Sequence, residues 1–159
     1  MLRPASSEDV KTLARLWEAA WHDAHRDHVP PALLPLRDAA YFDTAMEACW
    51  PQVRLIAEYG AISGFHLIDP PWLDLLFVAS AARGTGVAAT LLDDAETNLR
   101  DAGVTLGQIE CLAKNTRALY FYEKHGWTVA GTLRVEVQTP QGLVSLPSVK
   151  LEKSFGARR

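Results

Sequence analysis

Two glycines stand one residue apart where a buried strand gives way to a helix, in Arg83-Gly84-Thr85-Gly86-Val87-Ala88. Without a Cβ, Gly84 and Gly86 allow the backbone to turn sharply and a ligand to approach it closely. The first amides of a helix have no partner within the helix, and the helix dipole adds partial positive charge there. Together with the cation of Arg83, these features indicate a site for a phosphate or a pyrophosphate.

Two other phosphate-binding motifs do not fit this segment. No lysine follows Gly86, so the segment is not a P-loop, and Ala89 occupies the third glycine position of a Rossmann dinucleotide site. The glycines are also compatible with a strand-to-helix turn that needs them for chain geometry alone, because short glycine motifs are weakly specific. From these residues alone, both interpretations stay open.

The elements around this turn follow from the spacing of apolar residues. A strand at Leu73–Val78 precedes the turn, and the helix that it opens ends near Ala102. Upstream, the pattern predicts a strand, two helices and a hairpin, at Met1–Pro4, Ser7–Trp21, Asp38–Cys49, Val53–Glu58 and Ala61–Ile68. Downstream, it predicts a strand, a helix and a second hairpin, at Leu106–Ala113, Asn115–His125, Thr128–Thr139 and Leu143–Lys153. This order predicts an α/β fold with a mixed sheet flanked by helices.

Length, charge and composition are those of an ordinary globular protein. The 159 residues suit one domain, which we expect over residues 1–155, with a tail at 156–159 that includes Arg158 and Arg159. The net charge of −3 without a basic stripe argues against nucleic acid as the main partner. Cys49 and Cys111 match no metal-binding spacing, and no signal segment or membrane-spanning run is visible, so we expect a cytoplasmic protein that binds no membrane.

A second segment sharpens the interpretation of the glycine turn. Its spacing fits the pattern N-x-x-A-x-x-x-Y-x-x-x-G-[FW], with Asn115, Ala118, Tyr122, Gly126 and Trp127. The glycine turn fits [RQ]-x-x-G-x-[GA]. With both motifs in register, the chain resembles the GCN5-related N-acetyltransferases (GNAT) over about Val53–Phe155, while residues 1–52 match only in helix placement. The resemblance implies this family's acyl-CoA N-acyltransferase fold, a mostly antiparallel seven-stranded sheet flanked by about four helices.

The resemblance implies acetyl-CoA as the donor substrate and no metal. Backbone groups of Phe77 and Val78 would pair with the pantetheine arm where two strands splay apart. Asn115 would hydrogen-bond the same arm, and it could equally be the plain cap of its helix, a role compatible with the first. The amides that would hold the pyrophosphate are those of Arg83, Gly84, Thr85, Gly86, Val87 and Ala88. Ala118 and Tyr122 would complete the cofactor-binding residues.

The resemblance assigns the chemistry to Tyr122. In the family, this tyrosine protonates the departing CoA thiolate or donates a hydrogen bond to it, which neutralises the charge that develops on sulfur. Taken without its motif, an aromatic side chain on such a helix is more often a core residue.

The acceptor amine needs a base, because free amines are mostly protonated near neutral pH. Glu110 is a carboxylate on an otherwise apolar strand, five residues before Asn115. A glutamate at this spacing acts as the base in the ribosomal-protein alanine N-acetyltransferases. Glu110 could equally be a solvated side chain on the open strand edge, and Asp74 or a water relay competes with it for the role.

The histidine-rich run His22–His28 resembles the loop that lines the acceptor pocket in many members of this family. Its three histidines at intervals of three residues could share part of a helix face, which makes zinc conceivable. Because the family needs no metal and Pro30 follows, a solvated polar loop is the preferred interpretation.

The sequence therefore predicts an N-acetyltransferase in which a primary amine or a peptide N-terminus attacks acetyl-CoA directly. Neither cysteine has the partner pattern of a covalent nucleophile. The alternative is a non-catalytic acyl-CoA-binding or regulatory domain, and a plain nucleotide-binding module is more remote. The identity of the acceptor stays open, and the last hairpin offers an exposed edge through which a homodimer could form.

Overall fold

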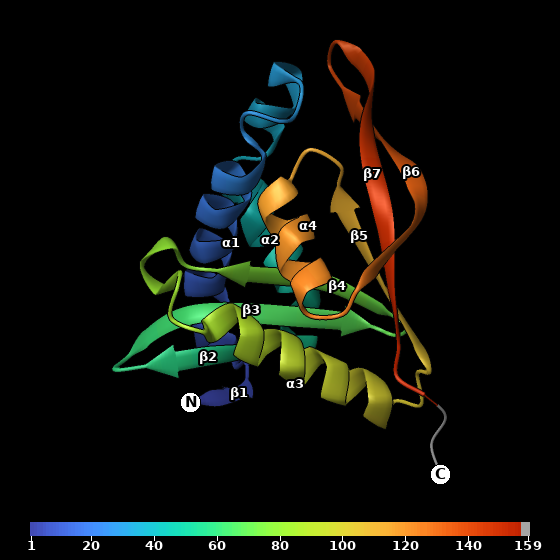
Figure 1. The fold of residues 1–159 in the computed structure, drawn as a ribbon. Coiled ribbons are helices and arrows are strands. Elements are labelled where there is room, and N and C mark those ends of the chain that lie inside the picture. The colour runs from blue at the N-terminus through green and yellow to red at the C-terminus, as the bar shows by residue number, and fades with distance from the viewer. Residues whose placement is uncertain (157–159) are drawn as a thin grey trace.

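The computed structural model describes residues 1–156, so Arg158 and Arg159 of the predicted tail lie outside the described residues. Within residues 1–156, seven strands form one sheet in the order β1-β2-β3-β4-β5-β7-β6 (Figure 1). They are β1 (Leu2–Pro4), β2 (Arg54–Glu58), β3 (Ala61–Asp69), β4 (Trp72–Val78), β5 (Leu106–Leu112), β6 (Thr128–Thr139) and β7 (Gly142–Ser154). Neighbouring strands are antiparallel except β4 and β5, which confirms the predicted mixed, mostly antiparallel α/β fold.

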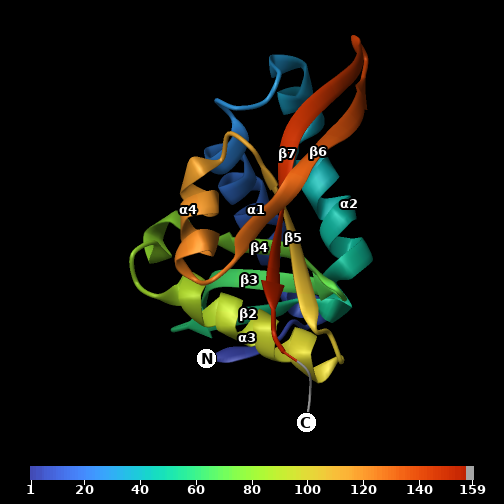
Figure 2. The same cartoon turned by 45° about the vertical axis from the view of Figure 1, so that its right-hand side comes forward.

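Four α-helices of the described residues cover the two faces of this sheet: α1 (Val10–His25), α2 (Ala39–Cys49), α3 (Val87–Asp101) and α4 (Thr116–Lys124). One core packs α1 and α2 against β2 and β3, and a second packs α3 and α4 against β5 and β7. Figure 2 shows α2 and α3 apart, on either side of the sheet. None of the helices within residues 1–156 has the length and apolar character needed to cross a membrane.

The predicted end of the first helix is wrong. α1 continues beyond Trp21 to His25, and the backbone N–H of Arg26 donates to the His22 carbonyl at 2.9 Å. His22 and His25 therefore lie on the helix and not in a loop. The polar residues of this run allow another helical turn, and the helix ends at His25, before Pro30 is reached.

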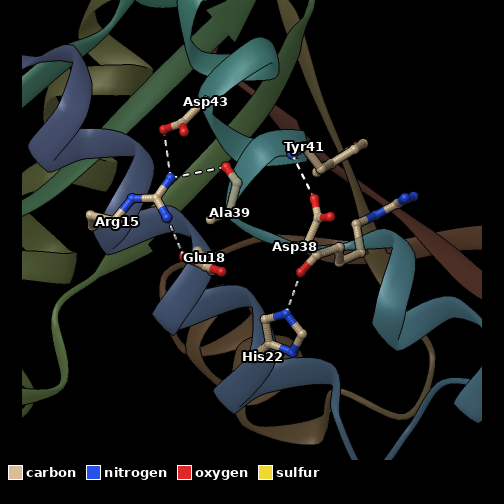
Figure 3. A network of polar contacts seen from close by, with 8 residues as sticks. Arg15, Glu18, His22, Asp38, Ala39, Tyr41 and Asp43 are labelled. Atoms are coloured by element: carbon tan, nitrogen blue, oxygen red, sulfur yellow. Dashed lines mark hydrogen bonds and ion pairs between the residues drawn. The ribbon is translucent and has the colours of Figure 1, made fainter.

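A polar network fixes α1 against the start of α2 (Figure 3). Arg15 Nη2 donates to the Ala39 carbonyl at 2.9 Å and to Asp43 Oδ1 at 2.5 Å. About two turns later, His22 Nε2 donates to the Arg37 carbonyl at 2.6 Å. These contacts hold two separate points of α1, so the helix has a defined rotation about its own axis.

The sheet opens between β4 and β5. These parallel strands share a single register position, Trp72 opposite Gln108. Beyond it, β4 continues to Val78 against β3, and β5 continues to Leu112 against β7. The two strands therefore separate toward their carboxyl ends (Figure 1), and one side of each strand end has no neighbouring strand.

Gly64 on β3 permits the close approach of α3 to the sheet. A Cβ at this position would lie 2.8 Å from Leu91 Cδ1 on α3 and 2.8 Å from the Phe77 carbonyl oxygen. Because the carbonyl cannot move without disturbing β4, we predict that Gly64→Ala lowers the free energy of unfolding by about 1–3 kcal/mol, as other overpacked sites do. Urea denaturation measures this change.

Gly131→Ala on β6 is the matched control. A Cβ there would meet no atom within 4 Å, and its φ lies outside the left-handed region. We expect this variant to change the free energy of unfolding by less than about 0.5 kcal/mol. Equal losses in the two variants would contradict the packing role of Gly64.

Candidate active site

The glycine turn joins β4 to α3 and has an open outer face. Gly84 and Gly86 have φ of 74° and 87°, in the left-handed region that favours glycine, and Gly86 is the N-cap of α3. Thr85 Oγ1 donates to the Ala82 carbonyl and closes the turn from within. A Cβ on either glycine would meet no atom within 4 Å. The turn therefore requires glycine for its conformation and also leaves space where a ligand could reach its amides.

A cavity of about 300 Å³ lies beside this turn. Its walls come from the end of β4, the glycine turn, the start of α4 and the last turns of α1. The predicted cofactor-binding residues that line it are Phe77, Val78, Arg83, Gly84, Gly86, Val87, Ala88, Asn115, Ala118 and Tyr122. Thr85 does not line it, and its hydroxyl donates to the Ala82 carbonyl. The fold thus brings the two sequence motifs to one cavity.

α1 supplies a wall that the sequence analysis missed. Ala20 and Ala24 lie one helical turn apart and both face the cavity. Their small side chains leave the cavity open where larger ones would fill it. Two small residues four positions apart on one helix could have indicated this wall in the sequence. The predicted helix ends at Trp21, however, so Ala24 is assigned to a loop. The cavity wall also includes Leu76, Arg117 and Phe121, which the motifs did not single out.

Asn115 caps α4 at the edge of this cavity. Its side-chain oxygen accepts a hydrogen bond from the Ala118 backbone N–H at 3.2 Å, which satisfies one of the unpaired amides of the first turn. The cap uses only the oxygen of the side-chain amide, so the NH₂ group of Asn115 is a hydrogen-bond donor at the cavity wall.

Tyr122 belongs both to the core and to the cavity wall. Its side chain packs between Phe121 and Trp127, with ring centroids 5.4 and 6.5 Å away, and only 8% of the residue is exposed. Burial, and to a smaller extent the nearby Cys111, raises the pKa of the Tyr122 phenol above its ordinary value. The phenol is therefore protonated at neutral pH and can donate a hydrogen bond into the cavity.

The helix that carries Tyr122 is held at its end by the buried carboxylate of Glu96 on α3. Glu96 accepts a hydrogen bond from Trp127 Nε1 at 3.3 Å and pairs with Lys153 Nζ at 2.7 Å. The same Nζ donates to the His125 carbonyl at 2.8 Å. This network joins α3, β7 and the residues after α4, so the position of Tyr122 is set by three elements.

The two candidate bases lie at a different cavity. Glu110 and Asp74 line a polar cavity of about 350 Å³ together with Asp69, Trp72 and Leu73. Each lies two residues beyond the single paired position of β4 and β5, where the strands begin to separate. Burial raises the pKa of the Asp74 carboxyl, and the charge of Asp69 adds to the rise. The structure brings Glu110 and Asp74 together but places neither on the wall that Tyr122 lines.

The histidines of α1 are engaged with the backbone. His22 binds the Arg37 carbonyl, while His25 Nδ1 donates to the Trp21 carbonyl at 2.8 Å and its ring lies 4.8 Å from that of Trp21. Burial lowers the pKa of His25, which favours the neutral imidazole. In the part of the chain that the structure describes, no group of three or more His, Cys, Asp or Glu side chains is arranged to hold a metal ion.

Comparisons with known proteins bear on this site. A family model described as an acetyltransferase (GNAT) domain matches residues 48–139, which is more than half of the chain and includes both motifs. None of the curated proteins matches the sequence significantly.

Solved structures share the fold over nearly the whole chain. A GCN5-related N-acetyltransferase from Rhodopseudomonas palustris has a TM-score of 0.76 at 22% identity and covers 98% of this chain and 95% of its own. PaiA N-acetyltransferase from Thermoplasma acidophilum in complex with coenzyme A has a TM-score of 0.73 at 16% identity, covering 98% of each chain. Ribosomal-protein-alanine N-acetyltransferase from Brucella melitensis has a TM-score of 0.67 at 20% identity, covering 98% of this chain and 99% of its own. By its fold and its family match, the chain belongs to the GNAT acetyltransferases.

Proposed function

We propose that the chain transfers the acetyl group of acetyl-CoA to a primary amine by direct attack. The observation that carries this proposal is a single cavity lined by the glycine turn, by the free end of β4 and by Tyr122. These three features suit the three parts of one donor, namely its phosphates, its extended arm and its departing sulfur. The coenzyme A complex of the PaiA neighbour supports an acyl-CoA ligand.

The free end of β4 is suited to an extended, amide-containing chain. Phe77 and Val78 pair with β3 on one side, and the strand that would pair on the other side has already separated. The two amides of a pantetheine arm can therefore bind the backbone there as an added strand would. In this arrangement the N–H groups of Asn115 lie opposite the arm, and the amides from Arg83 to Ala88 hold the pyrophosphate.

In the proposed reaction, the neutral amine attacks the thioester carbonyl, the C–N bond forms and the C–S bond breaks. The electron pair of that bond leaves with the sulfur, which accepts a hydrogen bond or a proton from Tyr122. Because burial raises the pKa of this phenol, it is a weaker acid than a thiol, and a hydrogen bond to the developing charge is favoured over early proton transfer. A carboxylate or a water removes the proton of the amine.

We predict that Tyr122→Phe lowers kcat on the order of 100-fold, because the departing sulfur loses its hydrogen-bond donor. The Kd for acetyl-CoA should stay close to that of the wild type, since the ring still fills its site. Release of the CoA thiol measures turnover with a panel of amino acids, polyamines, aminoglycosides and peptides, and calorimetry measures binding.

Tyr120→Phe is the matched control, because Tyr120 lies on the outer side of α4 with 70% of the residue exposed, and we expect it to act as the wild type. An unchanged kcat in Tyr122→Phe would exclude the donor role. If the wild type binds acetyl-CoA but releases no thiol with any amine of the panel, the non-catalytic acyl-CoA-binding alternative is favoured instead.

We propose Glu110 as the base and predict that Glu110→Gln lowers kcat/KM near neutral pH by about 10- to 100-fold. The loss should shrink as the pH rises, because the amine then loses its proton to solvent. The pH profile of kcat/KM checks both statements. Asp74→Asn is the matched comparison from the same cavity. A loss in Asp74→Asn with none in Glu110→Gln would move the role to Asp74, and full activity in both would leave a water relay.

Direct attack also predicts that Cys111 takes no part in the reaction. Burial, and then the charge of Glu110, raises the pKa of this thiol to about 12, so it is protonated and a poor nucleophile. Cys111→Ala should retain turnover, and thiol reagents near neutral pH should modify Cys111 only after unfolding. An acetyl group found on Cys111 by mass spectrometry during turnover would contradict direct attack.

A further inference from the structure

Asp23 on α1 forms ion pairs with two arginines that line the cavity beside the glycine turn, although Asp23 itself does not line that cavity. Its Oδ2 accepts a hydrogen bond from Arg83 Nη2 and lies 3.4 Å from Arg117 Nη2. Arg83 opens the glycine turn that leads into α3, and Arg117 lies in the first turn of α4. Both arginines line the cavity, and their two guanidinium groups share one carboxylate. The ion pairs also hold the last turns of α1 against the opposite wall.

This arrangement places a negative charge on the two arginines that would meet the phosphates of the proposed donor. The N-termini of α3 and α4 and the two arginines all favour an anion. A phosphate offers more charge and more acceptor oxygens than a carboxylate, so it competes well for the same guanidinium groups. The side chains of Asp23, Arg83 and Arg117 are 48%, 36% and 60% exposed. Ion pairs this exposed are weak, so replacing the carboxylate by another anion costs little free energy.

We propose that Asp23 occupies the place of a phosphate group of the cofactor and is displaced from Arg83 and Arg117 when acetyl-CoA binds. This inference rests on the proposed function, because the displacing phosphate belongs to the donor substrate. It assigns phosphate recognition to Arg117, which lies outside the glycine-turn motif. It also means that the donor must break both ion pairs and release the last turns of α1 from the glycine turn.

Asp23 has two opposing effects on donor affinity. It holds the two arginines near the cavity in the free protein, which favours binding. It also competes for them and repels the incoming phosphates, which opposes binding. Exposed ion pairs hold their side chains in place only weakly, so Asp23 favours donor binding little by positioning the arginines. Its competition with the phosphates for the same arginines is therefore the larger effect on the Kd for acetyl-CoA.

The test compares Asp23→Asn with Asp27→Asn, a variant with the same change of charge at an exposed residue in the turn after α1. We expect Asp23→Asn to lower the Kd for acetyl-CoA by about three- to tenfold, the size expected for the loss of two weak ion pairs. Asp27→Asn should leave the Kd unchanged. Calorimetry at fixed ionic strength measures both, and circular dichroism confirms that each variant is folded.

Two further arms separate phosphate competition from a general loosening of α1. S-acetylpantetheine carries no phosphate, so its KM should be the same in the wild type and in Asp23→Asn. Arg117→Gln should weaken acetyl-CoA binding. Adding Asp23→Asn to this variant should increase the affinity for acetyl-CoA by a smaller factor than it does in the wild-type background. 3′-Dephospho-acetyl-CoA identifies the group: if the gain persists, the pyrophosphate displaces Asp23, and if it is lost, the 3′-phosphate does.

Three results would overturn the inference. The first is a Kd for acetyl-CoA in Asp23→Asn that equals or exceeds that of the wild type. The second is an equal gain with S-acetylpantetheine, which would indicate a looser cavity and no competition for phosphate. The third is a wild-type protein that binds no acetyl-CoA, in which case the proposed function fails and this inference fails with it.

Discussion

The separation of β4 from β5 is the constraint on which the candidate site depends. The two strands share one register position, so most of their facing edges have no strand partner. Unpaired backbone groups must find other partners or face solvent. The end of β4 therefore lines a cavity, and the glycine turn that follows it carries α3 back across the sheet. The other walls of the cavity come from α1 and α4, which lie over the opening.

Two separate cores keep this opening in shape. α1 and α2 pack on one face of the sheet with Trp17, Phe42 and Phe65, and α3 and α4 pack on the other with Tyr122 and Trp127. Each core has its own polar anchor, at Arg15 on the first side and at Glu96 on the second. The walls of the cavity thus belong to well-packed elements, which is the condition for holding a reacting group in place.

The fold and the two motifs could be predicted from the sequence because their signals are local. A turn that needs glycine, a cap such as Asn115 and the alternation of apolar residues all act within a few residues of the chain. The contacts of Asp23 with Arg83 and Arg117 join residues far apart in the sequence, and no local pattern marks them. For the same reason, the sequence placed Glu110 on a strand face but could not separate its cavity from that of Tyr122.

The two cavities have a kinetic consequence. The cavity with Tyr122 and the cavity with Glu110 have no lining residue in common, although both lie along the same opening of the sheet. A donor bound in the first cavity leaves the second free for an acceptor. Under the proposed function, the acceptor can therefore bind before CoA has been released. Both substrates are then bound at once in a ternary complex, and steady-state rates plotted against one substrate at fixed levels of the other form intersecting lines, in contrast to the parallel lines of ping-pong exchange.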